Sequence, residues 1–201
     1  MAQVTTSDVI TLIRGLIKDL AQTDGRDSHT YDSDTSFSLS KDYVVESSIS
    51  VYKNGIELTL TTDYTYNSTT NKITITASLT KNDDILITYN YYARYSDSEI
   101  TSFIKSSLSH FTARRYKKYF YINDSDEIVT LNGVNPTYEE GDAIARITAI
   151  EIDPQNTRIR TPEFTVESVE RKSKKEQIDE VLDSFMRSYG VVDFLEDDAN
   201  A

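Results

Sequence analysis

Two stretches of helical sequence are separated by a long stretch of strand sequence, and this interruption limits the possible folds more than any other feature. Apolar residues recur with helical spacing over about 7–23, where Ser7 is the expected N-cap, and again after a capping box formed by Ser96 and Glu99. Over about 31–92, apolar residues instead alternate with Ser and Thr. An inserted module enters and leaves at nearly the same point, so the two helices can still pack together. We therefore expect two cores.

The inserted passage is expected to contain about five or six antiparallel strands. Asn54-Gly55 is the strongest hairpin signal, and polar stretches at 67–72 and 81–84 are expected to turn the chain again. Strict alternation buries one face of each strand and leaves the other wet, which indicates an antiparallel sheet or a small sandwich. The preceding stretch, 22–34, has the composition of a loop.

Two more helices and a tail complete the expected α+β organisation. A third helix is expected to start near Pro136, and a fourth covers about 172–189 and stops at Gly190. The segment 153–167, with two prolines, is expected to be extended. The expected domains are a discontinuous helical domain of about four helices over 1–30 and 93–190, a β module over 31–92 and an acidic flexible tail over 191–201.

Composition excludes several classes of function. A formal net charge of -12 argues against wrapping nucleic acid and against binding an anionic membrane surface. The chain has no cysteine, so thiol chemistry and cysteine-ligated zinc are excluded. No apolar run reaches the ~20 residues of a membrane helix. The apolar fraction of 38% is low, so we expect oligomerisation to supply part of the buried surface.

The residues that carry chemistry are few, and their settings favour structural roles. His29 lies in a polar stretch and His110 lies among helical aromatic residues, with no cysteine to assist either. Adjacent acidic pairs point apart rather than together, and the Asp-Ser-Asp triplets lack the glycine and distal glutamate of a calcium loop. These pairs and triplets lie at 83–84, 139–140, 32–34 and 124–126. We therefore expect no enzyme, no metal and no cofactor.

A basic and aromatic cluster at 114–119 is the most prominent polar patch. It either contacts an acidic partner or DNA phosphates, or it solvates a helix end and complements the helix dipole. A second basic cluster at 171–175 has the same two interpretations. The extended segment 158–167 and the tail offer apolar anchors for a neighbouring chain. The candidate partner-binding residues are Arg114, Arg115, Lys117, Lys118, Phe164, Val166, Phe194 and Leu195.

The spacing of the helical residues resembles the framework of tailed-phage head-to-tail connector proteins, also called adaptors. The residues that carry the resemblance are Asp8-Val9-Ile10, Leu12-Ile13-Arg14, Leu16-Ile17-Lys18-Asp19, Tyr95-Ser96-Asp97-Ser98-Glu99-Ile100, Phe103-Ile104-Lys105 and Leu108. Val51-Tyr52-Lys53-Asn54-Gly55 and Ile85-Leu86-Ile87-Thr88-Tyr89 are similar to small β modules of virion proteins. The framework covers about half of the chain, and its motifs are apolar spacing and caps. Minimal adaptors lack the insertion.

The resemblance implies a structural virion protein of the head-tail neck, assembled in the host cytoplasm. It implies a homo-oligomeric ring, usually twelvefold, that binds the portal protein above and a neck or tail protein below. An acidic lumen would let genomic DNA pass without specific binding. The alternative is a carbohydrate- or receptor-binding virion module. Exposed, clustered tyrosines would favour the alternative, and alternately buried tyrosines would favour the scaffold.

Overall fold

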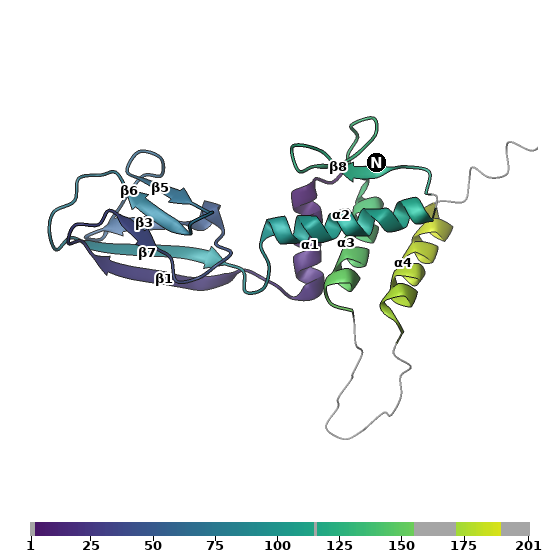
Figure 1. Cartoon of the computed structure of the whole chain (residues 1–201), viewed down its shortest axis with the longest axis horizontal. Coiled ribbons are helices and arrows are strands. Elements are labelled where there is room, and N and C mark those ends of the chain that lie inside the picture. Colours follow the sequence, from purple (N-terminus) through teal and green to yellow (C-terminus); the bar gives the residue numbers. More distant parts are fainter. Residues whose placement is uncertain (1–2, 115, 155–171, 190–201) are drawn as a thin grey trace, which may run out of the picture. The chain divides into compact units, whose positions relative to one another are not determined.

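The computed structural model describes residues 3–114, 116–154 and 172–189 of the chain. The chain divides into two compact units (Figure 1). We call Met1–Lys18 with Asp97–Ala201 the helical unit and Asp19–Ser96 the β unit. Helices and antiparallel sheets are both present, so the predicted α+β class is confirmed. Within the described ranges, no helix has the length and apolar character needed to cross a membrane.

The helical unit is built around one central helix, α3. The described helices are α1 (Thr6–Ile17), α2 (Asp97–Ala113), α3 (Tyr138–Ile152) and α4 (Lys174–Tyr189). α3 packs against each of the other three, and most of its residues from Glu140 to Ile150 are buried. Its small residues allow close approach: a Cβ on Gly141 would lie 2.5 Å from Cγ2 of Val4. A helix that packs against three others buries most of its surface, and on α3 the residues that stay exposed are Tyr138 and Arg146.

Capping boxes determine where α1 and α3 begin. The Thr5 side chain accepts a hydrogen bond from the Asp8 amide, while the Asp8 carboxylate accepts one from the Thr5 amide. The N-cap of α1 is therefore Thr5, and the prediction of Ser7 is wrong. Thr137 and Glu140 form the same box at α3. α1 ends at Ile17 rather than near 23, because Lys18 takes a left-handed conformation with φ 57°.

A short hairpin that the sequence did not indicate lies between α2 and α3. It consists of β8 (Phe120–Ile122) and β9 (Ile128–Thr130), paired antiparallel. Phe120 and Ile128 are buried, and the Phe120 ring lies 6.1 Å from that of Phe111 on α2. The hydroxyl of Thr6 accepts a hydrogen bond from the Ile128 amide at 2.7 Å, which joins β9 to the start of α1.

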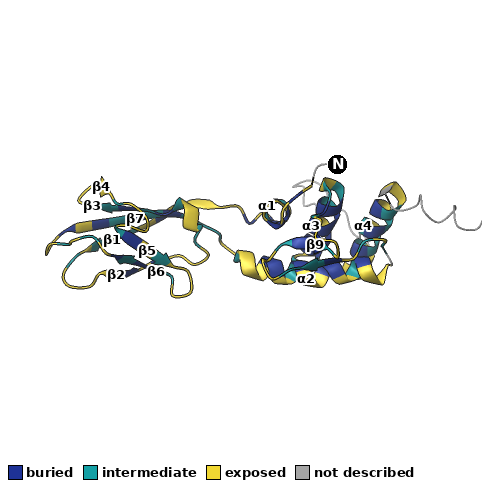
Figure 2. Ribbon diagram, turned by 90° about the horizontal axis from the view of Figure 1, so that it is seen from above, coloured by how far each residue is buried: buried dark blue, intermediate teal, exposed yellow. Residues whose placement is uncertain are grey.

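The β unit is a two-layered sandwich. Figure 2 shows the sheets as separate layers, one with strand order β1-β7-β3-β4 and one with order β2-β6-β5. Side chains from both sheets form one core, among them Val51, Ile73, Ile85 and Ile87, all fully buried. The strands are β1 (Gln22–Thr30), β2 (Ser36–Ser38), β3 (Ser50–Lys53), β4 (Ile56–Glu57), β5 (Tyr64–Asn67), β6 (Lys72–Ile75) and β7 (Asp84–Tyr91), with a 3-10 turn, η1 (Glu46–Ser48).

Strand β1 corrects the expectation of a loop over 22–34. It pairs antiparallel with β7, from Gln22 opposite Tyr91 to Thr30 opposite Asp84. β1 is an edge strand with mostly exposed side chains, so its polar composition is that of a strand facing water. The number of strands in the β unit is seven, above the expected five or six.

The inserted unit also begins earlier than the expected residue 31, since β1 belongs to its larger sheet. The carboxylate of Asp19, which is buried, accepts hydrogen bonds from the amides of Ala93 and Arg94 at 3.2 Å each. This contact ties together the two chain segments at which the β unit begins and ends. In the helical unit, the guanidinium of buried Arg14 lies 2.6 Å from the carboxylate of Asp97 and so joins α1 to α2.

Candidate interaction surface

The cationic segment predicted to meet a partner is partly used inside the helical unit. The guanidinium of Arg114, at the end of α2, lies 2.7 Å from the carboxylate of Asp179 and 3.3 Å from that of Asp183. Both acids lie on α4, one turn apart. The hydrogen bond to Asp179 raises the pKa of Arg114, and Arg114 in turn lowers the pKa of Asp179. Arg114 therefore fastens α4 to α2.

Lys118 lies against a buried carboxylate. Its ammonium is 2.7 Å from Oε1 of Glu140, which also accepts a hydrogen bond from the Tyr116 hydroxyl at 2.7 Å. The other oxygen of Glu140 accepts from the Thr137 amide in the α3 capping box. Burial by itself would raise the pKa of Glu140, but these three donors lower it below the usual value. Burial and the bond to Glu140 raise the pKa of Tyr116.

The remaining predicted partner-binding residues are distributed differently. Lys117 is exposed at the same end of the helical unit. Arg115, Phe164, Val166, Phe194 and Leu195 lie outside the described residues.

The second basic cluster also makes internal contacts. Lys172 pairs with Glu180, and the Lys174 ammonium donates to the Glu151 carbonyl at 3.1 Å. One sequence signal could have shown the internal role of Lys118. The spacing of Thr137 and Glu140 is that of a capping box, and it places an acidic residue in a partly buried cap that Lys118 can pair with.

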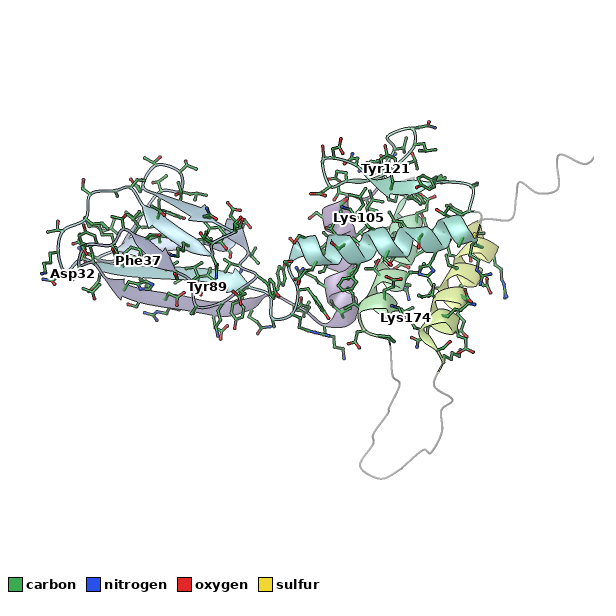
Figure 3. The ribbon with its side chains drawn as sticks, in the orientation of Figure 1. Asp32, Phe37, Tyr89, Lys105, Tyr121 and Lys174 are labelled. Carbon is green, nitrogen blue, oxygen red and sulfur yellow. The ribbon has the colours of Figure 1, made fainter. Side chains whose placement is uncertain are left out.

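An exposed apolar surface, which we call the hairpin patch, lies at one end of the helical unit. It consists of the exposed residues Tyr119, Leu131, Val134 and Tyr138 together with the partly buried Tyr121, from the β8–β9 hairpin, the turn after it and the first residue of α3. The side chain of Tyr121 on this hairpin is labelled in Figure 3. The register that pairs Phe120 with Thr130 sets Tyr119 opposite Leu131 just beyond the ladder.

Two residues of the hairpin patch are more than half exposed. Leu131 is 73% exposed and Tyr138 is 55% exposed, while the rings of Tyr119 and Tyr121 stack with centroids 6.5 Å apart. Single exposed apolar residues are ordinary, but a group of them at one end of a unit indicates an interaction surface. This surface was not predicted from the sequence, because the hairpin that assembles it was not predicted.

The tyrosines of the β unit are mainly buried or partly buried. Tyr64 donates from its hydroxyl to the Ile49 carbonyl at 3.0 Å, and Tyr89 donates to the Asp27 carboxylate at 2.7 Å. The Lys41 ammonium lies over the ring of Tyr91, 5.4 Å from its centroid. Among the β-unit tyrosines, all of which the structure describes, only Tyr43 is exposed. This pattern is the one expected of a scaffold.

The residues considered for catalysis make structural contacts. Nε2 of His110 lies 2.9 Å from the carboxylate of Glu151, between α2 and α3. His29 packs on Phe37 with ring centroids 4.9 Å apart. The carboxylate of Asp83 accepts hydrogen bonds from the Thr80 amide, from Asn54 and from Lys53. These bonds lower the pKa of Asp83, and the bond from Thr80 has the largest effect. In the part of the chain that the structure describes, no group of three or more His, Asp or Glu residues is placed to hold a metal ion.

Comparison with known protein families finds no match for this chain, and no curated protein matches its sequence.

Proposed function

We propose that this protein is a structural connector of a tailed phage, forming a ring beneath the portal that joins the head to the tail. The observation that carries the proposal is the interrupted helical framework. α1 and α2 are separated in sequence by the whole β unit, yet both pack on α3, and the buried Arg14 is paired with Asp97 between them. This is the arrangement expected if the β unit was added to a helical adaptor.

The polar contacts of the helical unit support a scaffold role. Arg114 and Lys118 hold α4 and the start of α3, and His110 joins α2 to α3. Side chains that could act in catalysis therefore contribute to packing. The hairpin patch supplies an exposed apolar surface on which another subunit or the portal can pack.

The charge of the chain supports the same function. A ring of subunits that each carry a formal charge of -12 presents an acidic environment to DNA. Phosphates are repelled from such a surface, so DNA passes through the channel without specific binding. In this proposal the partners are other copies of the chain, usually twelve to a ring, the portal protein and the next neck or tail protein. Phe164, Val166, Phe194 and Leu195 are proposed contacts to these neighbours.

The test is co-expression with the portal protein encoded by the same phage genome, followed by purification of the portal and electron microscopy. We expect the chain to purify with the portal as a ring. Leu131→Asp should reduce its recovery about tenfold or more, because it places a charge in an apolar interface. Ile56→Asp is the matched control, since Ile56 in the β unit is 71% exposed, nearly as much as Leu131.

The location of the chain in the assembled virion is a second test of the connector proposal. If the chain is found at the distal tip of the tail, away from the portal, the connector proposal is wrong and the receptor-binding alternative replaces it. The buried and partly buried tyrosines of the β unit do not favour that alternative.

A further inference from the structure

The dipeptide Asn-Gly occurs twice in the chain, and its asparagine is prone to lose the side-chain amide spontaneously. Asn54-Gly55 joins β3 to β4, and Asn132-Gly133 lies in the turn after β9. Asparagine is thermolabile because the backbone nitrogen of the next residue can attack the carbonyl carbon of its side chain. A following glycine has no Cβ to hinder this approach. The two sites share the same local chemistry, so only the tertiary structure can make them differ.

The reaction converts an amide into a carboxylate and consumes only water. The backbone nitrogen of glycine loses its proton and bonds to Cγ of asparagine, while the bond from Cγ to Nδ2 breaks and ammonia leaves. Water then opens the resulting cyclic imide at either of its carbonyls. The product is aspartate or isoaspartate, and either one adds a negative charge. The asparagine side chain must rotate towards the following nitrogen, so hydrogen bonds that hold the amide slow the reaction.

At Asn54 both ends of the side-chain amide are held. Nδ2 donates to the carboxylate of Asp83 at 2.7 Å, and Oδ1 accepts a hydrogen bond from the Asp84 amide at 2.8 Å. Asp83 is buried and lies 3.1 Å from the Lys53 ammonium, so the acceptor is itself fixed. A hydrogen bond to a charged acceptor is about twice as strong as one between neutral groups. Rotation of Asn54 towards Gly55 must break both bonds.

At Asn132 the side chain is not held. Asn132 and Asn54 are both exposed, so exposure does not separate the two sites. Within the described residues, the side chain of Asn132 makes no hydrogen bond or ion pair. The Gly133 amide donates to the Thr130 carbonyl at 2.8 Å, and this neutral bond must open before the nitrogen can attack. Exposed turns open locally at a small cost in free energy, so Asn132 has the lower barrier.

We propose that Asn132 is a site of spontaneous deamidation in the folded chain, whereas Asn54 is protected by its bonds to Asp83 and to the Asp84 amide. Asn132 follows Leu131 in the hairpin patch, so the product places a carboxylate beside an apolar side chain that is 73% exposed. A charge at this position weakens apolar contacts that the patch makes, and it accumulates as the protein ages. This inference does not depend on the connector function.

Peptide mapping by mass spectrometry on the full-length chain, incubated in mildly alkaline buffer, tests the proposal. In the folded chain we expect deamidation at Asn132 to be about tenfold or more faster than at Asn54, because Asn54 must break two side-chain bonds, one of them to a charge. In urea, where neither side chain is held, the two sites should react at similar rates. No product at Asn132 in the folded chain, or a rate at Asn54 equal to that at Asn132, would overturn the proposal.

Two variants test whether Asp83 protects Asn54. Asp83→Ala removes the acceptor of the Asn54 amide and should accelerate deamidation at Asn54 about tenfold, while the rate at Asn132 stays unchanged. Asp32→Ala is the matched control, since the carboxylate of Asp32 is exposed and pairs with Lys81 in the same unit. This control should change neither rate. A folded Asp83→Ala chain in which Asn54 reacts no faster than in the unmodified chain would overturn the protection by Asp83.

Discussion

Replacing Lys118 by Met tests whether this residue is an internal ion-pair partner rather than a free binding group. Met keeps much of the aliphatic stem of lysine and removes the ammonium that lies 2.7 Å from Oε1 of Glu140. The Glu140 side chain is 4% exposed, so its carboxylate would keep only the Tyr116 hydroxyl and the Thr137 amide as donors. The helical unit should therefore become less stable.

The size of the effect follows from the exposure of the two partners. Removing one partner of a fully buried ion pair costs about 3 to 5 kcal/mol, because a charge is left buried without compensation. The Lys118 side chain is 37% exposed, so water already screens part of the interaction. The two remaining donors also retain part of the stabilisation of the carboxylate. We expect Lys118→Met to lower the free energy of unfolding by about 2 kcal/mol at neutral pH.

The effect should depend on pH in a defined direction. The folded-state pKa of Glu140 is lowered, so its ionised form contributes stability above the ordinary glutamate pKa. That contribution is lost as the pH falls through the lowered folded-state value. The difference between Lys118→Met and the unmodified chain should therefore be largest at neutral pH and shrink below about pH 4. Urea unfolding followed by circular dichroism at 222 nm measures it in the helical unit.

Two further variants make the reasoning refutable. Lys105→Met changes an exposed lysine in the middle of α2 (Figure 3) and should alter stability by less than about 0.5 kcal/mol. In a double-mutant cycle with Glu140→Gln, the two substitutions should be clearly less than additive, because Gln keeps the capping geometry without the charge. An effect of Lys118→Met no larger than that of Lys105→Met, or one independent of pH, would show that the pair does not stabilise the fold.

Three point substitutions address packing, and one replacement of a whole segment addresses domain organisation. His29→Phe should stabilise the β unit by about 1 kcal/mol in urea unfolding, because within the described residues the buried Nε2 has no hydrogen-bond partner; a loss of stability would contradict this. Gly141→Ala should destabilise the chain by about 1 kcal/mol through its clash with Val4. Gly15→Ala should stabilise the chain by up to about 1 kcal/mol, because a Cβ added at Gly15 meets open space. If Gly141→Ala and Gly15→Ala had equal effects on stability, the predicted difference between the two sites would be refuted. Replacing residues 19–96 by a short Gly-Ser linker should leave a helical protein by circular dichroism, whereas loss of the helical signal would mean that the units do not fold separately.

Elements with a strong local pattern were predictable. The alternation from Ile49 to Tyr91 placed strands β3 to β7, and the Asn54-Gly55 turn has the positive φ angles, 50° and 80°, that a tight hairpin requires. The apolar spacing also located α2, α3 and α4 to within a few residues. In these elements neighbouring residues carry the information, because burial on one face imposes a period of two or of 3.6.

Elements without such a pattern were missed. β1 is a polar edge strand that is recognisable only through its pairing with β7, whose residues lie some sixty positions later. β8 and β9 are only three residues each, too short to establish a period. The candidate site was missed with them, since the hairpin patch combines residues from β8, the turn after β9 and α3.

The sequence by itself determined the fold class and the presence of a strand-rich insertion between helices, because hydrophobic periodicity is a local property. It also determined the overall acidic charge and the lack of thiol chemistry, which are matters of composition. Only the tertiary structure decided which charges are available to a partner. Arg114 and Lys118 look alike in the sequence as surface cations, yet their acids, Asp179 and Glu140, come from helices far along the chain. Ion pairs of this kind depend on how helices pack, and packing is set by contacts between distant residues.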